Sequence, residues 1–139
     1  DAAQFNAPAD LAISPDGSAL FVADCENDKI RRVELATGAV TTLAGSGEEG
    51  GADGVGGAAQ FRYPNGLTIS PDGSALFVAD ADNNKIRRAE VATGAVTTLA
   101  LMAWAARRSS ATRTASQSAR TAAHCLWRMP TTTRSVGRR

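Results

Sequence analysis

The stretch SPDGSALFVAD runs from residue 14 to residue 24 and returns unchanged at residues 70–80. Around it, residues 5–44 align without gaps to residues 61–100, and 30 of the 40 aligned positions are identical. A repeat of this length is one supersecondary unit, which cannot bury its apolar face alone. The sequence therefore predicts neighbouring copies of one small unit that pack against each other.

Each repeat divides into four short apolar stretches separated by turn signals. They are residues 11–14, 19–23, 29–35 and 39–44 in the first repeat, and 67–70, 75–79, 85–91 and 95–100 in the second. Pro-Asp-Gly ends the first stretch, because proline presets φ, aspartate bonds the nearby backbone and glycine accepts positive φ. Four short antiparallel strands joined by tight turns are typical of one blade of a β-propeller.

Two segments depart from this simple pattern. Ile30, Val33 and Leu35 break the period of two, which predicts either a bulge at Arg31-Arg32 or an arginine that lies along the blade surface. Residues 45–59 read GSGEEGGADGVGGAA, and this glycine-rich composition predicts a long surface loop between the blades.

The motifs of both repeats resemble the NHL-repeat family of six-bladed β-propellers. In the first repeat they are Pro8 before Leu-Ala-Ile, Pro-Asp-Gly at 15–17, LFVAD at 20–24, Asn27, Ile-Arg at 30–31, and TGAVTTLAG at 37–45. Most recur between Pro64 and Ala100. The resemblance covers residues 1–100 and implies blades around a central channel, with binding at the loop faces.

The predicted fold class is therefore all-β, with two four-stranded antiparallel blades of an incomplete propeller of the six-bladed type. A closed ring of this kind needs about six blades, so two blades cannot close it. The chain divides into a first blade at 1–44, a glycine-rich inter-blade loop at 45–60, a second blade at 61–100, and an arginine-rich tail at 101–139 that is predicted to be disordered.

Charge is distributed unevenly along the chain. All 14 acidic residues lie in residues 1–100 with 7 of the 15 basic ones, whereas the last 39 residues hold 8 arginines and no acid or lysine. Such asymmetry usually indicates a folded body with a basic tail. The two cysteines make neither a metal-binding spacing nor a disulfide framework. No apolar run approaches membrane-spanning length, so a membrane partner is not expected; the compartment is left open.

Residues 101–139 have a second interpretation, as a third repeat translated out of frame. If each codon of residues 52–90 is read from its second base, all 39 residues of the tail can be produced by permitted codons. Val55 before glycine then gives Trp104, for example, and Asp53 before glycine gives Met102. The hypothesis makes the tail, including the adjacent His124 and Cys125, an accidental product and not a catalytic pair.

Six residues are candidates for binding-face or turn positions, because they follow the second strand or lie in the third strand of each repeat. An aspartate and an asparagine three residues later can contact a ligand or satisfy turn backbone groups, and the latter is favoured because both repeats carry them. The arginines belong to a basic cluster that can attract RNA phosphates, although a solvated surface is the favoured interpretation. The six are Asp24, Asn27, Arg31, Asp80, Asn83 and Arg87.

No catalytic, cofactor-binding or metal-binding residue is predicted, and no cofactor. Glu48, Glu49 and Asp53 in the glycine-rich loop match no calcium-loop pattern. The chain is expected to act as a binding scaffold and not as an enzyme. Its protein partners are expected to bind through the propeller loop faces or through further blades. The alternatives are part of a propeller enzyme of the lyase, lactonase or strictosidine-synthase-like kind whose catalytic blades are absent here, an RNA-binding propeller, and a non-functional product of a frameshifted gene.

Overall fold

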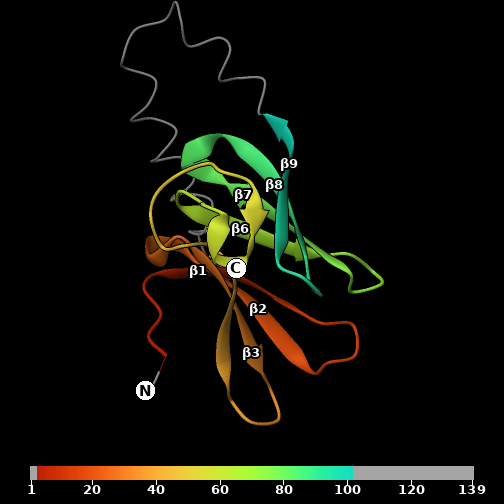
Figure 1. Cartoon of the computed structure of the whole chain (residues 1–139). Helices are drawn as coiled ribbons and strands as arrows, with labels where there is room; N and C mark the ends of the chain where they lie inside the picture. The colour runs from red at the N-terminus through yellow and green to blue at the C-terminus, as the bar shows by residue number, and fades with distance from the viewer. Residues whose placement is uncertain (1–2, 102–139) are drawn as a thin grey trace, which may run out of the picture. The chain divides into compact units, whose positions relative to one another are not determined.

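The computed structural model of the protein describes residues 3–101, which form two antiparallel sheets (Figure 1). Blade 1 has the strand order β1-β2-β3-β4 and blade 2 the order β5-β9-β8-β7-β6. The strands of blade 1 are β1 (Pro8–Ile13), β2 (Ala19–Asp24), β3 (Lys29–Glu34) and β4 (Val40–Ala44). Those of blade 2 are β5 (Gly54–Val55), β6 (Pro64–Ile69), β7 (Ala75–Asp80), β8 (Lys85–Glu90) and β9 (Ala95–Leu101). The prediction of two antiparallel blades is confirmed, while the expected disorder of the tail and its frameshift lie outside the described residues.

The first strand of each blade begins earlier than the apolar pattern indicated. β1 starts at Pro8 and β6 at Pro64, three residues before the predicted starts, and each pairing shifts register by one residue after the proline. The polar segment after β2 forms the 3-10 helix η1 (Cys25–Asn27), and η3 (Ala81–Asn83) is its counterpart after β7. Both end on a residue in the left-handed conformation, Asp28 or Asn84, residue types that tolerate it.

The irregularity predicted in the third strand lies on the partner strand. Ile30 pairs with Ala44 and Arg31 with Thr42, so the extra residue is Leu43 of β4. Blade 2 has the same shift between β8 and β9. The bulge itself therefore belongs to the outer strand, not to Arg31-Arg32.

The glycine-rich segment between the blades contains short regular elements that the sequence does not predict. It contains β5, which pairs with β9, and the 3-10 helix η2 (Gly56–Ala58). Its last residues bring Ala59 and Phe61 into the core, where both are fully buried. Glycine is required at position 54, since a Cβ there would lie 2.8 Å from the carbonyl carbon of Ala58. The glycines thus permit close packing and not only flexibility.

One hydrophobic core joins the two blades. Side chains alternate across a strand, so β2 contributes Phe21 and Ala23 to this core, whereas β7 contributes Leu76 and Val78 from the opposite alternation. All four are at most 1% exposed. The identical strands of the two repeats therefore use opposite faces to make one contact.

Two carboxylates add polar contacts across the same boundary. Asp10 of β1 accepts a hydrogen bond of 2.8 Å from the backbone N–H of Leu67. Asp28 accepts one of 2.7 Å from the backbone N–H of Tyr63. These contacts position the loops at the end of the blades that carries the candidate site.

Candidate functional site

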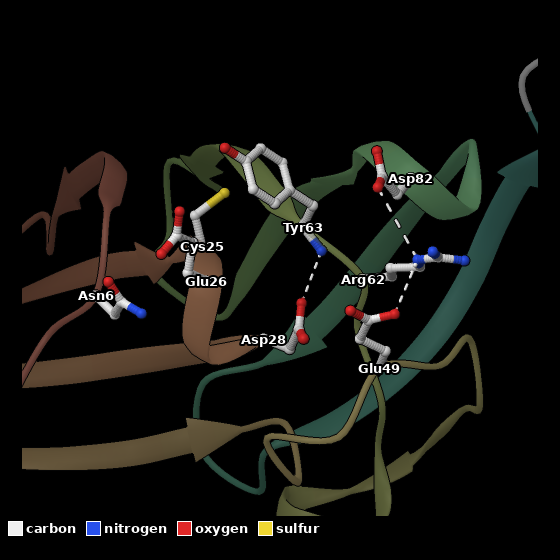
Figure 2. A pocket seen from close by; sticks show the side chains of 8 residues that line it. All are labelled: Asn6, Cys25, Glu26, Asp28, Glu49, Arg62, Tyr63 and Asp82. Carbon is white, nitrogen blue, oxygen red and sulfur yellow. Dashed lines mark hydrogen bonds and ion pairs between the residues drawn. The ribbon is translucent and has the colours of Figure 1, made fainter.

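A shallow pocket with a volume of about 340 Å³ lies where the two blades meet (Figure 2). It is built from the segments before β1 and β6, from η1 and η3, and from the inter-blade segment. Its lining residues are Asn6, Cys25, Glu26, Asp28, Glu49, Arg62, Tyr63 and Asp82. Among them only Glu49 is suggested as a site by the sequence, in the glycine-rich loop that matches no calcium-binding pattern.

Arg62 is the single basic side chain of the pocket lining and is shared by two carboxylates. Its Nε lies 3.3 Å from Oε2 of Glu49 and 3.9 Å from Oδ2 of Asp82. All three side chains are about half exposed or more, so these ion pairs are weak in water. With Glu26 and Asp28 the lining holds four carboxylates against one guanidinium, which leaves the pocket acidic.

Three groups of the pocket lining have shifted pKa values. Burial, reinforced by the carboxylate of Asp28, raises the pKa of the Cys25 thiol to about 11. Burial also raises the pKa of Asp28 against the opposing hydrogen bond from Tyr63. The neighbouring Cys25, with burial, raises the pKa of the Tyr63 hydroxyl. Cys25 therefore stays a thiol at neutral pH, and a buried thiol of this kind is a poor nucleophile.

The pocket is lined by residues that distinguish the repeats. The aligned repeats differ at 10 of 40 positions, and seven of the eight lining residues come from those positions. Cys25 has Ala81 as its counterpart, for example, and Tyr63 has Ala7. Architecture is carried by shared residues, so a concentration of unshared residues marks this pocket as the candidate site.

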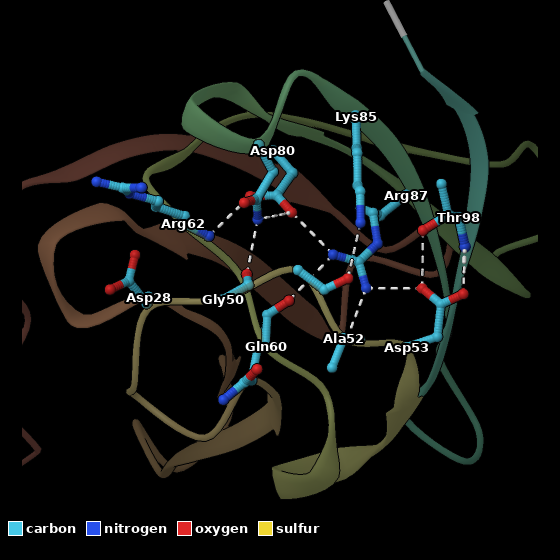
Figure 3. A network of polar contacts seen from close by, with 12 residues as sticks. Asp28, Gly50, Ala52, Asp53, Gln60, Arg62, Asp80, Lys85, Arg87 and Thr98 are labelled. Atoms are coloured by element: carbon cyan, nitrogen blue, oxygen red, sulfur yellow. Dashed lines mark hydrogen bonds and ion pairs between the residues drawn. The ribbon is translucent and has the colours of Figure 1, made fainter.

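The shared residues form a different structure, a buried polar network in blade 2 (Figure 3). Oδ2 of Asp80 accepts hydrogen bonds from Asn83 at 2.8 Å and from Arg87 at 2.8 Å. Asp80 and Arg87 are both fully buried. Oδ1 of Asp80 accepts a hydrogen bond of 2.8 Å from the backbone N–H of Arg62. This bond positions the segment before β6, which lines the pocket.

Arg87 ties the inter-blade segment to blade 2. Its guanidinium donates to the carbonyl oxygens of Gln60 at 3.0 Å and Ala52 at 2.8 Å, and to Asp53 at 2.8 Å. Asp53 in turn accepts from the N–H and the hydroxyl of Thr98. Burial opposes ionisation of Asp53, but the hydrogen bonds from Thr98 and Arg87 outweigh it and lower its pKa. Asp53 is thus an ion-pair partner of Arg87.

Blade 1 has the same network with fewer contacts. Oδ1 of Asp24 accepts the N–H of Asn6 at 2.8 Å, and its Oδ2 accepts from Asn27 and Arg31 at 2.9 and 3.2 Å. Within residues 3–101 the bond to Asp24 is the one hydrogen bond that the side chain of Arg31 donates, and this side chain is 12% exposed. The six candidate residues from the sequence therefore lie together in two matching networks, one per blade.

The expectation of a solvated basic face is wrong for the two arginines of these networks. Arg87 is fully buried and Arg31 largely so, because each has an acidic partner in the interior. It holds for the adjacent Arg32 and Arg88, which are more than one third exposed and pair with Glu34 and Glu90. Sequence alone could not separate neighbours that lie on opposite sides of the strand.

Within residues 3–101, no group of three or more histidine, cysteine or acidic side chains is placed to hold a metal ion. Among the helices of the same part of the chain, none combines the length and the apolar character needed to cross a membrane.

Relatives of the chain carry the NHL repeat in their names. NHL repeat-containing protein 2 of Bos taurus is 38% identical over 107 residues, which are 70% of this chain and 15% of that protein. Protein SUPPRESSOR OF QUENCHING 1, chloroplastic, of Arabidopsis thaliana is 38% identical over 87 residues, or 63% of this chain and 8% of that protein. The chain thus spans about 15% or less of the length of these relatives. No family model matches the chain.

Solved structures agree in fold. An auxiliary nutrient binding protein from Bacteroides ovatus superimposes with a TM-score of 0.55 at 23% identity, over 65% of this chain and 24% of that one. The protein of the same description from Bacteroides thetaiotaomicron gives 0.54 at 24% identity, with the same coverage. At such identity the likeness concerns the fold alone, which is that of propeller blades whose sheets are not closed into a ring.

Proposed function

The chain belongs to the NHL-repeat family, and on that premise we propose that it is a binding module that docks a protein partner at the pocket between its blades. It contributes a surface and no chemistry of its own. The observation that carries the proposal is that seven of the eight lining residues occupy positions at which the repeats differ, while the aspartate, asparagine and arginine that both repeats share are engaged in the buried networks.

The charge of the pocket indicates which kind of chemical group of a partner can bind there. Four carboxylates surround one arginine, and the ring of Tyr63, which is 44% exposed, stands at the rim. A lysine or arginine side chain of the partner fits this environment, because it gains charged hydrogen bonds and packs its apolar stem on the aromatic ring. The partner surface is therefore basic at the point of contact.

The buried networks support this proposal over RNA binding. Arg31 and Arg87 are committed to Asp24 and Asp80, so neither is free to contact phosphate. The remaining charges around the pocket repel phosphate. Protection of the Cys25 thiol by burial likewise supports a binding role for the pocket and not covalent chemistry.

The test is titration of the full chain with the tripeptide Gly-Arg-Gly, followed by backbone NMR. Weak binding in the millimolar range is expected for so small a probe. The shift changes should concentrate at the pocket residues, and Gly-citrulline-Gly, which lacks the charge, should leave them unchanged. Higher salt should weaken the effect, since the contact is electrostatic.

A matched pair of variants sharpens the result. Glu49→Gln removes a carboxylate from the pocket, whereas Glu48→Gln makes the same change one residue away, outside the lining. We expect at least a threefold loss of affinity for the first and none for the second. Shift changes spread over the whole surface, or equal behaviour of the two variants, would refute the proposal.

A further inference from the structure

Each blade has two apolar faces, and within residues 3–101 only one face of each blade is covered. The open face of blade 1 consists of the side chains that pair across its strands on the side away from blade 2. They are Leu11, Ile13, Leu20, Val33 and Val40, together with Val22, which is only 7% exposed. The open face of blade 2 consists of Gly66, Thr68, Phe77, Ala79 and Ile86. It forms a groove of about 230 Å³ with an almost wholly apolar lining.

The apolar residues of each open face have counterparts in the other repeat that are buried in the contact between the blades. Leu11 is 59% exposed, while its counterpart Leu67 in the contact between the blades is 8% exposed. Conversely Phe77 and Ile86 are partly exposed, while their counterparts Phe21 and Ile30 are at most 1% exposed. The open face of blade 2 therefore repeats the covered face of blade 1, and the open face of blade 1 repeats the covered face of blade 2.

We propose that the open face of blade 2 binds the open face of blade 1 of a second copy of this chain, in the arrangement that joins the two blades within one copy. The two open faces are complementary, because the blades of one copy already make the same contact with largely the same residues. Burial of the exposed leucine and isoleucine side chains supplies the driving force.

Such an interface is heterologous, since it joins two different surfaces. It leaves one open face at each end of every assembly that is not closed, so copies add head to tail until a ring closes or a filament forms. A ring of two to four copies would contain about four to eight blades, which is the range of known propellers.

The contact between copies differs from the internal one in its polar anchors. Asp10 and Asp28 bridge the blades within a copy, and their counterparts in blade 2 are Gly66 and Asn84. Glycine has no carboxylate, whereas the asparagine side-chain oxygen can still accept a backbone N–H. The association is therefore weaker than the internal contact and depends on concentration.

Sedimentation velocity of the full chain over a range of concentrations tests the proposal. Leu11→Glu places a charge on the open face of blade 1, and Thr68→Glu places one on the open face of blade 2. Both positions are exposed in the single copy, so the fold is preserved, which circular dichroism verifies. Each variant alone should stay monomeric, whereas an equimolar mixture should give a 1:1 dimer through the one intact pair of faces.

Val55→Glu is the control, because Val55 is also 59% exposed but lies at the outer edge of blade 2. It should associate like the unmodified chain. A monomeric unmodified chain at all concentrations, unaltered association of either face variant, or a mixture that stays monomeric would overturn the proposal. So would association that high salt abolishes, because contacts between apolar faces persist in salt.

Discussion

Arg31 and Arg87 occupy the same position of two nearly identical repeats, yet their surroundings differ. Arg87 has four hydrogen-bond acceptors and is fully buried, whereas Arg31 has one acceptor among residues 3–101 and keeps some exposure. The difference comes from the segment at 52–60, which packs against blade 2. A residue's environment is therefore set by what docks on the blade, and not by the repeat alone.

Substitution of these arginines should reveal the difference in the free energy of unfolding. Arg87→Ala leaves Asp80 buried without its charged partner, and a loss of about 3–5 kcal/mol is expected. Arg31→Ala also leaves a buried carboxylate, that of Asp24, but it removes only one hydrogen bond of 3.2 Å from a side chain that keeps 12% exposure, so a smaller loss of about 1.5–3 kcal/mol is expected. Arg88→Ala, at an exposed ion pair, should change stability by less than about 1 kcal/mol. Urea unfolding followed by circular dichroism measures all three, and equal losses would contradict the assignment.

Asp28 offers a test of pH dependence, because its counterpart in blade 2 is Asn84 in the same left-handed conformation. Burial raises the pKa of Asp28 above 3.8, so the folded chain keeps this proton at pH values where the unfolded chain has lost it. The folded state then loses stability as pH rises from about the unfolded value through the folded one. Asp28→Asn removes this loss and keeps an acceptor for the N–H of Tyr63.

The expected result is that Asp28→Asn stabilises the chain at pH 7 and has little effect near pH 3, where both states of Asp28 are protonated. Thermal unfolding at a series of pH values measures the gain. A gain that is the same at every pH would show that the charge of Asp28 is not its cause.

At the level of elements, the glycine-rich segment acts as part of blade 2. β5 extends the sheet at β9, and Asp53 fastens the segment to Thr98. The turn before β9 takes part in the same packing, since the N–H of Gly56 donates to the carbonyl oxygen of Gly94 at 2.9 Å. The glycine-rich segment therefore does more than link the blades in sequence, because it also holds blade 2 in position against β4.

Two glycines at equivalent turns test this packing. Gly38 and Gly94 both have φ of +70°, but a Cβ on Gly38 meets nothing within 4 Å, whereas one on Gly94 would lie 2.5 Å from the carbonyl oxygen of Leu43. Gly38→Ala should cost about 1–2 kcal/mol for the left-handed backbone alone. Gly94→Ala should cost more, because the turn and β4 must also separate. Denaturant unfolding compares them, and similar losses would show that the turn does not pack as described.

On the scale of the whole molecule, residues 3–101 form two blades with one shared core, and within this part of the chain one apolar face of each blade is uncovered. The out-of-frame interpretation of residues 101–139 bears on the same faces. An in-frame third repeat would present to blade 2 the apolar residues that a second copy presents. The prediction concerns residues outside the described part of the chain.

Genomic DNA and transcript sequenced across the junction of Ala100 and Leu101 test that interpretation. If it is right, the frame-corrected sequence after Ala100 continues as ADGVGGAAQF and leads into a third repeat. If the shifted frame is found in both DNA and transcript, the arginine-rich sequence is a true part of the product.

Much of the fold could be predicted because its signals are local and occur twice. Pro-Asp-Gly fixes a turn wherever it stands, and ALFVAD forms a strand in both repeats. The candidate pocket could not be predicted in the same way, since residues 6–28 contribute to it together with residues 49–82 from the other blade. Comparison of the repeats did contain one usable signal, the clustering of their differences near the η1 segment.

The sequence by itself determined the four-stranded blade, its turns and the family, because each follows from short-range backbone preferences and from a pattern repeated along the chain. Tertiary structure alone decided that Arg87 is buried while Arg88 is exposed, that residues 52–59 join blade 2, and which face of each blade is covered. These depend on contacts between residues far apart in the chain. A side chain's burial is set by the packing partner that covers it, and two identical strands can therefore end in different environments.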